Sequence, residues 1–420
     1  MKCGLIGEKL THSFSAEIHR QLFDYEYRLI EVSADQLDTF MKDRRFSAIN
    51  VTLPYKEAVI PYLDVVDEAA LHIGAVNTIV NRDGNLYGYN TDFDGLYAMV
   101  QESGISLSGK KVLILGSGGT SKTALAVANA FDCASVMRVS RIEREDCITY
   151  DQAYANYGDA QILINATPCG MYPNLETISV DLDRFPKLES VVDVVYNPLR
   201  TRFVCDAQSR GLKAVGGLYM LVAQAVAAAE RFTGQTVDKR RVNEIYNRLL
   251  LDKENIVLVG MPRCGKTTVG KLLATLLGKT FLDIDELVVN KTGLPISELF
   301  NQVGEDGFRR IETEVIREIA SKQGAVIATG GGAILRRENV LHLKQNGRIY
   351  FLDRAVEKLP VSEDRPLSAT PLALQQRYKE RYPIYTTVCD VRIEADGMPH
   401  EVANFIREDL LYANFGFERS

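Results

Sequence analysis

Residues 260–267 read Gly-Met-Pro-Arg-Cys-Gly-Lys-Thr and match the GxxxxGK[ST] pattern of phosphate-binding loops. The apolar run 256–259 before the loop predicts a buried strand, and residues 268–277 after it predict a helix. Glycines let the backbone wrap around an anion, and the helix N-terminus adds positive potential. This strand–loop–helix unit predicts a nucleotide-binding α/β domain, and we interpret it as a small-molecule kinase.

The chemistry of such a loop assigns roles to its residues. Lys266 is expected to reach the β- and γ-phosphates of ATP, and the Thr267 hydroxyl to ligate Mg²⁺. The residues that we expect around ATP are Arg263, Cys264, Gly265, Lys266, Thr267 and Thr268.

Three later stretches bear on the phosphate acceptor. Asp283 and Asp285 stand two residues apart, which predicts two carboxylates on one face of a strand. Residues 307–312 offer arginines that suit a carboxylate or phosphate. The glycine-rich stretch 329–333 follows the apolar run 325–328 and would let a ligand approach the backbone closely.

Together these motifs resemble shikimate kinase over residues 255–412. The resemblance implies that Asp283 helps Thr267 to hold Mg²⁺ and that Asp285 orients or deprotonates the attacking hydroxyl. It implies that Arg365 closes over the phosphates as a catalytic lid residue. The shikimate site would comprise Asp285, Arg309, Gly331, Gly332 and Arg381.

The first 250 residues alternate apolar strands with helical stretches. Strands are expected at 3–7, 48–52, 75–80, 86–89, 111–115, 134–139, 162–164 and 191–195, with a hairpin turn at Asp83-Gly84. This alternation predicts a mixed sheet followed by a parallel, doubly wound sheet. Residues 217–251 are mostly helix-forming, and the polar stretch 252–255 suggests a domain boundary.

The strand at 111–115 is followed by the glycine-rich stretch 116–119, which suits the pyrophosphate of a dinucleotide. Arg141 and Arg144 follow the next strand, in the region where an NAD enzyme usually carries an acidic residue for the ribose 2′-hydroxyl. Arginines suit a 2′-phosphate, so we expect NADP(H), with NAD as the alternative.

Polar stretches at 11–15, 50–56, 74–78 and 88–92 follow the strands of the first sheet. With the stretches 165–171, 193–198 and 216–225 they resemble shikimate dehydrogenase over residues 1 to about 250. The resemblance implies a substrate-binding α/β domain at 1–93 plus helices 217–250, and a Rossmann-like NADP domain at 94–216.

The resemblance also implies residue roles. Lys56 and Asp92 would form the catalytic pair, because a lysine ammonium can protonate the oxygen of a ketone undergoing reduction. The substrate site would comprise Ser13, Ser15, Thr52, Lys56, Asn77, Asp92, Tyr196 and Gln224. The NADP site would comprise Gly116, Ser117, Gly118, Gly119, Thr120, Ser140, Arg141, Arg144, Thr167 and Gly217.

Composition limits the kinds of partner and the cellular location that we expect for this protein. The formal net charge of −6 gives no reason to expect nucleic acid or an anionic membrane as a partner. No signal peptide and no apolar run long enough for a membrane span is visible, and the scattered cysteines lack zinc spacing. We expect a cytoplasmic enzyme acting on small molecules, with its oligomeric state open.

The sequence therefore predicts a bifunctional fusion of shikimate dehydrogenase and shikimate kinase. The first part would reduce 3-dehydroshikimate with NADPH, and the second would phosphorylate shikimate with Mg·ATP to give shikimate 3-phosphate. One alternative is a quinate/shikimate dehydrogenase using NAD, fused to the kinase. The other is a regulator that senses these metabolites without catalysis.

Overall fold

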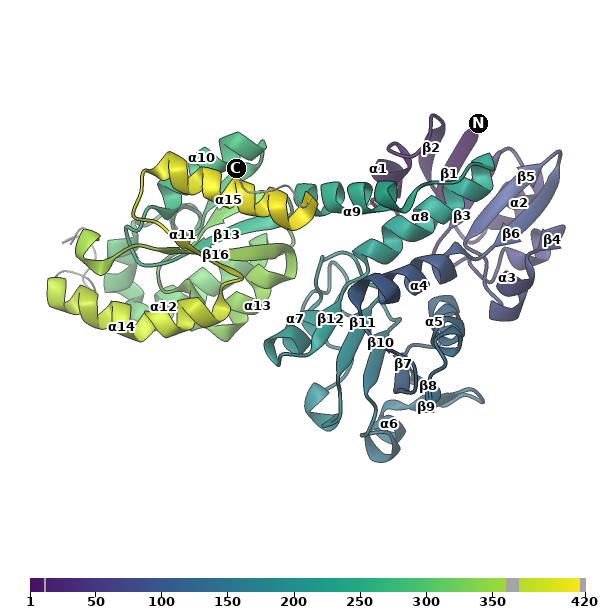
Figure 1. Ribbon diagram of the computed structural model, residues 1–420, viewed down its shortest axis with the longest axis horizontal. Coiled ribbons are helices and arrows are strands. Elements are labelled where there is room, and N and C mark those ends of the chain that lie inside the picture. The colour runs from purple at the N-terminus through teal and green to yellow at the C-terminus, as the bar shows by residue number, and fades with distance from the viewer. Residues whose placement is uncertain (11–12, 360–369, 416–420) are drawn as a thin grey trace. The chain divides into compact units, whose positions relative to one another are not determined.

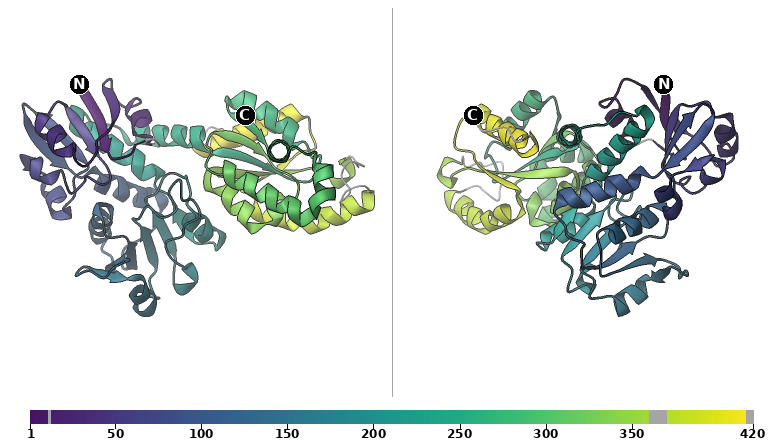
Figure 2. Two further views of the ribbon diagram at one scale, coloured as in Figure 1. Left: turned by 180° about the vertical axis from the view of Figure 1, so that it is seen from behind. Right: turned by 45° about the vertical axis from the view of Figure 1, so that its right-hand side comes forward.

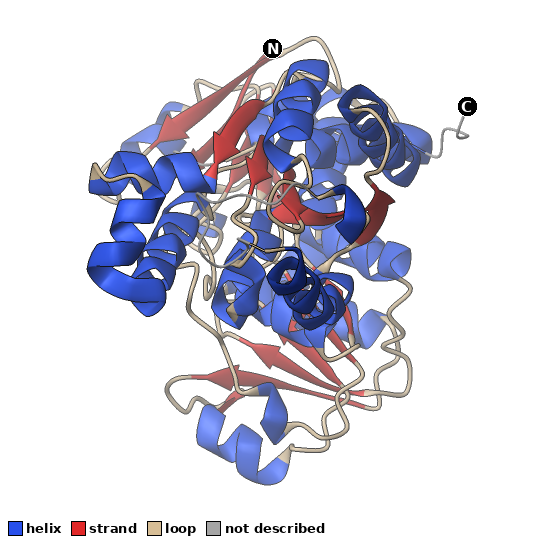
Figure 3. Ribbon diagram, turned by 90° about the vertical axis from the view of Figure 1, so that its left-hand side faces the viewer, coloured by secondary structure: helices blue, strands red, loops and turns tan. Residues whose placement is uncertain are grey.

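The computed structural model describes residues 1–10, 13–359 and 370–415 and divides into two compact units, Met1–Tyr246 and Asn247–Ser420 (Figure 1). The first unit contains two six-stranded sheets, and the second unit contains one five-stranded sheet. We call them the first, second and third sheets in chain order. Figure 3 shows strands with helices on either side, as expected for α/β domains.

The first sheet is mixed and has the order β2-β1-β3-β5-β6-β4. Its strands are β1 (Lys2–Gly7), β2 (Glu26–Glu31), β3 (Ala48–Val51), β4 (Val65–Val66), β5 (Thr78–Arg82) and β6 (Asn85–Tyr89). Helices α1 (Ser15–His19), α2 (Leu37–Asp43) and α3 (Glu68–Ile73) accompany it. The expected hairpin joins β5 to β6, and Asp83 and Gly84 both have positive φ, 51° and 89°, as its tight turn requires.

The second sheet is fully parallel, with the order β12-β11-β10-β7-β8-β9. Its strands are β7 (Lys111–Leu115), β8 (Ser135–Ser140), β9 (Cys147–Thr149), β10 (Ile162–Asn165), β11 (Ser190–Asp193) and β12 (Lys213–Val215). Helices α5 (Gly119–Ala130), α6 (Tyr150–Asn156) and α7 (Arg202–Ser209) connect them. This is the order of a Rossmann fold, and ligands bind such sheets where the strand order reverses, here between β7 and β10.

Two long helices join the first and second sheets. Helix α4 (Thr91–Ser103) follows β6, and α8 (Leu218–Thr233) follows β12. Near its start α8 contributes Tyr219 and Met220 to the core beneath the second sheet, and near its end it contributes Phe232 to the core of the first. The helices pack closely at Gly95, where a Cβ would lie 2.6 Å from the Met220 carbonyl oxygen. The following helix is α9 (Lys239–Lys253).

The third sheet is also parallel and has the order β14-β15-β13-β16-β17. Its strands are β13 (Asn255–Val259), β14 (Thr280–Asp283), β15 (Ala325–Ala328), β16 (Gly347–Asp353) and β17 (Val391–Glu394). Its helices are α10 (Lys266–Leu277), α11 (Ile284–Thr292), α12 (Ile296–Ile319), α13 (Arg337–Asn346), α14 (Pro371–Val388) and α15 (Pro399–Phe415). Helices α10 and α15 lie on one face, and α12, α13 and α14 lie on the other (Figures 1 and 2).

The expected fold class is confirmed: a mixed α/β domain, a Rossmann-like domain and a P-loop domain with a parallel sheet. One local expectation is wrong. Asp283 ends β14 and accepts a hydrogen bond from the Asp285 backbone N–H at 3.0 Å, so Asp285 lies in the first turn of α11 and not on a strand. An aspartate at this position satisfies a free amide of the helix end, which favours starting the helix there. In the described ranges, no helix combines the length and apolar character needed to cross a membrane.

Candidate active sites

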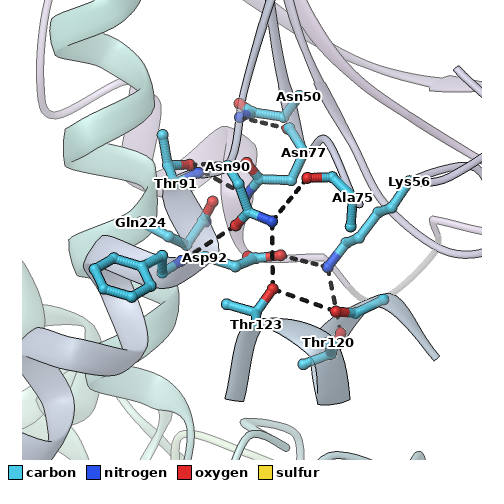
Figure 4. Close-up of polar contacts among 12 residues, drawn as sticks. Asn50, Lys56, Ala75, Asn77, Asn90, Thr91, Asp92, Thr120, Thr123 and Gln224 are labelled. Atoms are coloured by element: carbon cyan, nitrogen blue, oxygen red, sulfur yellow. Dashed lines mark hydrogen bonds and ion pairs between the residues drawn. The ribbon is translucent and has the colours of Figure 1, made fainter. Parts of the chain in front are cut away.

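Lys56 and Asp92 form an ion pair at the carboxyl edge of the first sheet. Lys56 lies in the turn after β3 and Asp92 in the first turn of α4, with Nζ and Oδ2 2.6 Å apart. Their side chains are only 13% and 9% exposed. Lys56 Nζ also lies 3.5 Å from the Thr120 hydroxyl, at the start of α5 (Figure 4). A charged, shielded pair therefore stands where the two sheets of the first unit meet.

A network of amides and hydroxyls holds the start of α4 in place. Asn77 Oδ1 accepts from the Thr91 backbone N–H at 2.7 Å, and its Nδ2 donates to the Thr91 hydroxyl at 3.1 Å. Asn90 caps α4 and donates to the Ala75 carbonyl and to Thr123 of α5, at 2.9 and 3.3 Å. These bonds fix Asp92 relative to both sheets (Figure 4). Asn90 and Thr123 are absent from the predicted site, although Asn90 precedes a helical run as capping residues do.

The remaining predicted substrate residues gather at the same edge. The Ser13 hydroxyl donates to the Ser15 hydroxyl at 3.1 Å. Tyr196 follows β11 and is hydrogen-bonded to Ser13; burial raises the pKa of its phenol, and that hydrogen bond partly opposes the rise. The half-buried Thr52 follows β3, and Gln224 of α8 lies beside Asp92 (Figure 4).

The glycine loop lies between β7 and α5, at the reversal of strand order. Gly116 has φ of 129°, and a Cβ there would lie 3.0 Å from the Ala166 carbonyl oxygen after β10. Gly118 caps α5 and borders open space, whereas a Cβ on Gly119 would lie 3.3 Å from the Ala75 Cβ. The neighbouring Thr167 hydroxyl donates to Asn165 at 2.6 Å. Open backbone at a helix N-terminus fits a dinucleotide pyrophosphate.

Two exposed arginines follow β8, which lies next to β7. Arg141 and Arg144 belong to the segment 141–146, and no ion pair of theirs is found in the described part of the chain. The Ser140 hydroxyl accepts from the Ile142 backbone N–H at 3.3 Å and shapes the start of the segment. Gly217 precedes α8, and a Cβ there would overlap the Val194 carbonyl. The arginines fit a cofactor that carries a 2′-phosphate.

The phosphate loop of the second unit has its lysine held inside. Lys266 Nζ donates to the carbonyls of Gly260 and Met261, at 2.9 and 2.8 Å, and lies 3.8 Å from the buried Cys264 sulfur. The Thr267 hydroxyl donates to Asp283 Oδ2 at 2.8 Å, so the two predicted metal residues are adjacent. Arg263, with φ of 63°, and Thr268 are exposed at the loop.

A second group of charged residues surrounds the glycines after β15. Arg309 Nη1 pairs with Glu312 Oε2 at 2.7 Å, and Arg381 Nη1 donates to the Gly331 carbonyl at 2.9 Å. A Cβ on Gly330 would lie 2.7 Å from Glu312 Oε1 and 2.9 Å from Asp285 Oδ1. The structure therefore brings Asp285, Arg309 and Arg381 together, whereas Arg365 lies outside the described residues.

Glu312 is missing from the predicted site although it stands at its centre. Its side chain is fully buried, and burial raises the pKa of its carboxyl, while Arg309 acts in the opposite direction. A Cβ on Gly332 would overlap the Arg309 guanidinium, so this pair occupies the space beside the glycines. The spacing of Arg309 and Glu312 by three residues on a helix is the signal that could have indicated the pair.

These two sites define the class of each unit: a dinucleotide-dependent dehydrogenase and a P-loop kinase. Comparisons with known proteins agree. The family model for the shikimate dehydrogenase substrate binding domain matches residues 5–79, and the model for shikimate kinase matches residues 262–411. A shikimate dehydrogenase (NADP(+)) of Clostridium perfringens is 39% identical over 264 residues, which cover 59% of this chain and 97% of that protein.

Solved structures give the same result for the first unit. Shikimate dehydrogenase 1 from Peptoclostridium difficile is 36% identical with a TM-score of 0.56, covering 59% of this chain and 98% of that one. The Thermus thermophilus shikimate 5-dehydrogenase in complex with NADP(H) and shikimate is 29% identical with a TM-score of 0.53, covering 59% and 99%. The chain belongs to the shikimate dehydrogenase family and is fused to a shikimate kinase domain, which confirms the predicted fusion.

Proposed function

We propose that the first unit reduces 3-dehydroshikimate to shikimate with NADPH and that the second unit transfers a phosphoryl group from ATP to the 3-hydroxyl of shikimate. The observation that carries the first assignment is the Lys56–Asp92 pair beside Thr120. It puts a proton donor between the polar residues of the first sheet and the glycine loop of the second. For the second unit, the supporting observation is the contact between Thr267 and Asp283 at the phosphate loop.

In the dehydrogenase, bound NADPH supplies the hydride that the ketone carbon accepts. Lys56 donates a proton to the ketone oxygen, so that the hydride on the carbon and the proton on the oxygen together convert the ketone into the hydroxyl. Asp92 holds the Lys56 ammonium in position through its 2.6 Å contact. Ser13, Ser15 and Tyr196 bind the carboxylate, and Thr52, Asn77 and Gln224 bind ring hydroxyls. The glycine loop, with Thr167 and Gly217 nearby, holds the pyrophosphate side of the cofactor, and Arg141 and Arg144 hold its 2′-phosphate.

In the kinase, bound ATP supplies the γ-phosphoryl group. The loop from Arg263 to Thr268 and the Lys266 ammonium hold its phosphates, and Thr267 and Asp283 would hold Mg²⁺. Asp285 orients the acceptor hydroxyl and takes its proton. The forks of Arg309 and Arg381 bind the carboxylate of shikimate beside the Gly331 and Gly332 backbone. Arg365 is proposed as the lid residue over the phosphates.

The regulator alternative fits the structure less well. A sensor without catalysis has no need to keep its reactive groups in contact, yet Lys56 still reaches Asp92 and Thr267 still reaches Asp283. The quinate and NAD alternative is not favoured either, because the exposed Arg141 and Arg144 after β8 suit a 2′-phosphate. Both reactions need only small molecules and suit the cytoplasm, where seven free cysteines stay reduced.

The two half-reactions can be assayed separately on the purified full chain. NADPH oxidation should require 3-dehydroshikimate, and ADP release should require both shikimate and Mg²⁺. ADP release independent of shikimate would remove the kinase assignment. The absence of substrate-dependent NADPH oxidation, with the kinase active in the same preparation, would remove the dehydrogenase assignment alone.

A further inference from the structure

The segment 141–146 after β8 carries positive and negative side chains at neighbouring positions. Residues 141–146 read Arg-Ile-Glu-Arg-Glu-Asp, so two arginines share six positions with three carboxylates. Arginine binds a carboxylate with the same guanidinium N–H groups that would bind a phosphate. Pairing within the segment would therefore compete with recognition of a cofactor 2′-phosphate.

Asp146 is held by a residue outside this segment. Arg138 lies in the middle of β8, is 5% exposed, and pairs through Nη2 with Asp146 Oδ2. Its Nη1 donates to the buried Ser121 hydroxyl at 3.5 Å, and that hydroxyl donates to the Gly118 carbonyl at 2.7 Å. One guanidinium thus links the segment to the turn that caps α5.

The backbone fixes where Asp146 stands. Arg144 and Cys147 exchange two backbone hydrogen bonds, each 3.2 Å long, and so close a tight turn with Glu145 and Asp146 at its centre. The Arg138 side chain anchors Asp146 beneath that turn. In the sheet, Arg138 of β8 also lies opposite Cys147 of β9. The turn therefore keeps the Asp146 carboxylate toward β8.

Glu143 is also bound from outside the segment. Gln152 of α6 donates to Glu143 Oε1 at 2.9 Å, and its own Oε1 accepts from the Thr149 backbone N–H at 2.8 Å. The cap of α6 thereby fixes which end of the Gln152 amide faces Glu143. Two of the three carboxylates are held by partners outside the segment, and within the described ranges Arg141 and Arg144 form no ion pair.

We infer that Arg138 is a positioning residue for cofactor recognition: by binding Asp146 it keeps that carboxylate away from Arg141 and Arg144 and leaves their guanidinium groups for the 2′-phosphate of NADPH. Gln152 does the same for Glu143. This inference rests on the proposed use of NADPH by the first unit. It assigns cofactor preference to a buried residue that acts through Asp146.

The test uses the full chain with Arg138→Met, whose side chain has a similar length and no charge. Calorimetric titration should show NADP⁺ binding weakened about tenfold, the size of one charge-assisted contact, with NAD⁺ binding changed less than about twofold. The KM for NADPH should rise while kcat at saturation stays. Arg138→Lys, which still offers Asp146 a cation, should keep most of the NADP⁺ affinity.

A double variant separates charge placement from simple support of the fold. Adding Asp146→Asn to Arg138→Met removes the released carboxylate and should restore NADP⁺ affinity. Equal losses for NADP⁺ and NAD⁺, or no recovery in the double variant, would overturn the inference. Unchanged NAD⁺ binding and an unchanged kcat at saturating NADPH report that the first unit of each variant is intact. A wild-type chain that fails to use NADPH would instead refute the proposed function.

Discussion

Lys56 Nζ lies 2.6 Å from Asp92 Oδ2 although the two residues are 36 positions apart in the chain. The contact depends on the first sheet, because β3 and β6 end at the same edge, and on the hydrogen bonds that fix the start of α4. The same ammonium lies 3.5 Å from Thr120 at the glycine loop. The proposed proton donor is thereby held at the meeting point of the two sheets.

Lys56→Ala should abolish reduction and leave phosphorylation intact. Loss of a positioned acid costs about a hundredfold to ten-thousandfold in rate. Measured kcat values for both half-reactions of the full chain check this. Lys111→Ala is the matched control, because that lysine pairs with Asp159 at the opposite end of β7 and should keep both activities. Reduction that survives in the Lys56 variant would assign the proton to another group.

Lys266→Ala should have the reverse effect, abolishing phosphorylation while reduction continues. Lys266 points into the loop, where its Nζ donates to the carbonyls of Gly260 and Met261. Lys271→Ala, on the exposed side of α10, serves as the control. If either active-site lysine variant silenced both reactions without unfolding the chain, two independent sites would be the wrong description.

Glu312→Gln should raise the KM for shikimate about tenfold and change the KM for ATP little, since one charge-assisted hydrogen bond to Arg309 is weakened. The cause is the loss of the partner that orients the Arg309 guanidinium. Steady-state kinetics with each substrate varied in turn give both constants. Glu318→Gln on the same helix, where the glutamate is exposed, should change neither. A selective rise in the KM for ATP would show that Glu312 supports ATP binding and that its assignment to the shikimate site is wrong.

Asp193 should make the stability of the first unit depend on pH. Burial raises the pKa of its carboxyl to about 7, despite hydrogen bonds from Thr201, Val195 and Asn165. The folded chain therefore binds more protons than the unfolded chain between about pH 4 and pH 7, and the free energy of unfolding falls as pH rises through that window.

The check compares thermal unfolding of the wild type with Asp193→Asn at several pH values. The wild type should lose stability relative to the variant as pH rises toward about 7, and the difference should level off above that pH. A difference that stays constant from mildly acidic to mildly alkaline pH would show that Asp193 does not titrate in this range.

Local patterns in the sequence predict much of this architecture. The apolar runs that become β7, β10, β13 and β15 are buried on both faces and read as continuous hydrophobic strands. Short or exposed strands carry no such signal: β2 is largely exposed and β9 has three residues, and neither was predicted. Asp285 was misplaced because a period of two does not reveal that Asp283 starts a helix.

In the candidate sites too, local motifs predict some residues, whereas residues that depend on packing are not predicted. The glycines of both loops and Lys266 of the phosphate loop follow from motif and context. Glu312 and Arg138 were missed because their importance comes from burial and from contacts with residues outside their own helix or strand, Asp285 for Glu312 and Asp146 for Arg138. Such contacts depend on the packing of α11 against α12 and of β8 against β9, which sequence patterns alone do not determine.

The most direct test of two consecutive reactions on one chain uses a deuterium label. The purified wild-type chain receives 3-dehydroshikimate, Mg·ATP and NADPH deuterated at the transferable position, and mass spectrometry identifies the product. Shikimate 3-phosphate that carries one deuterium is the predicted result. Deuterated shikimate without phosphate, or unreduced substrate, would contradict the assignment of both activities to this protein.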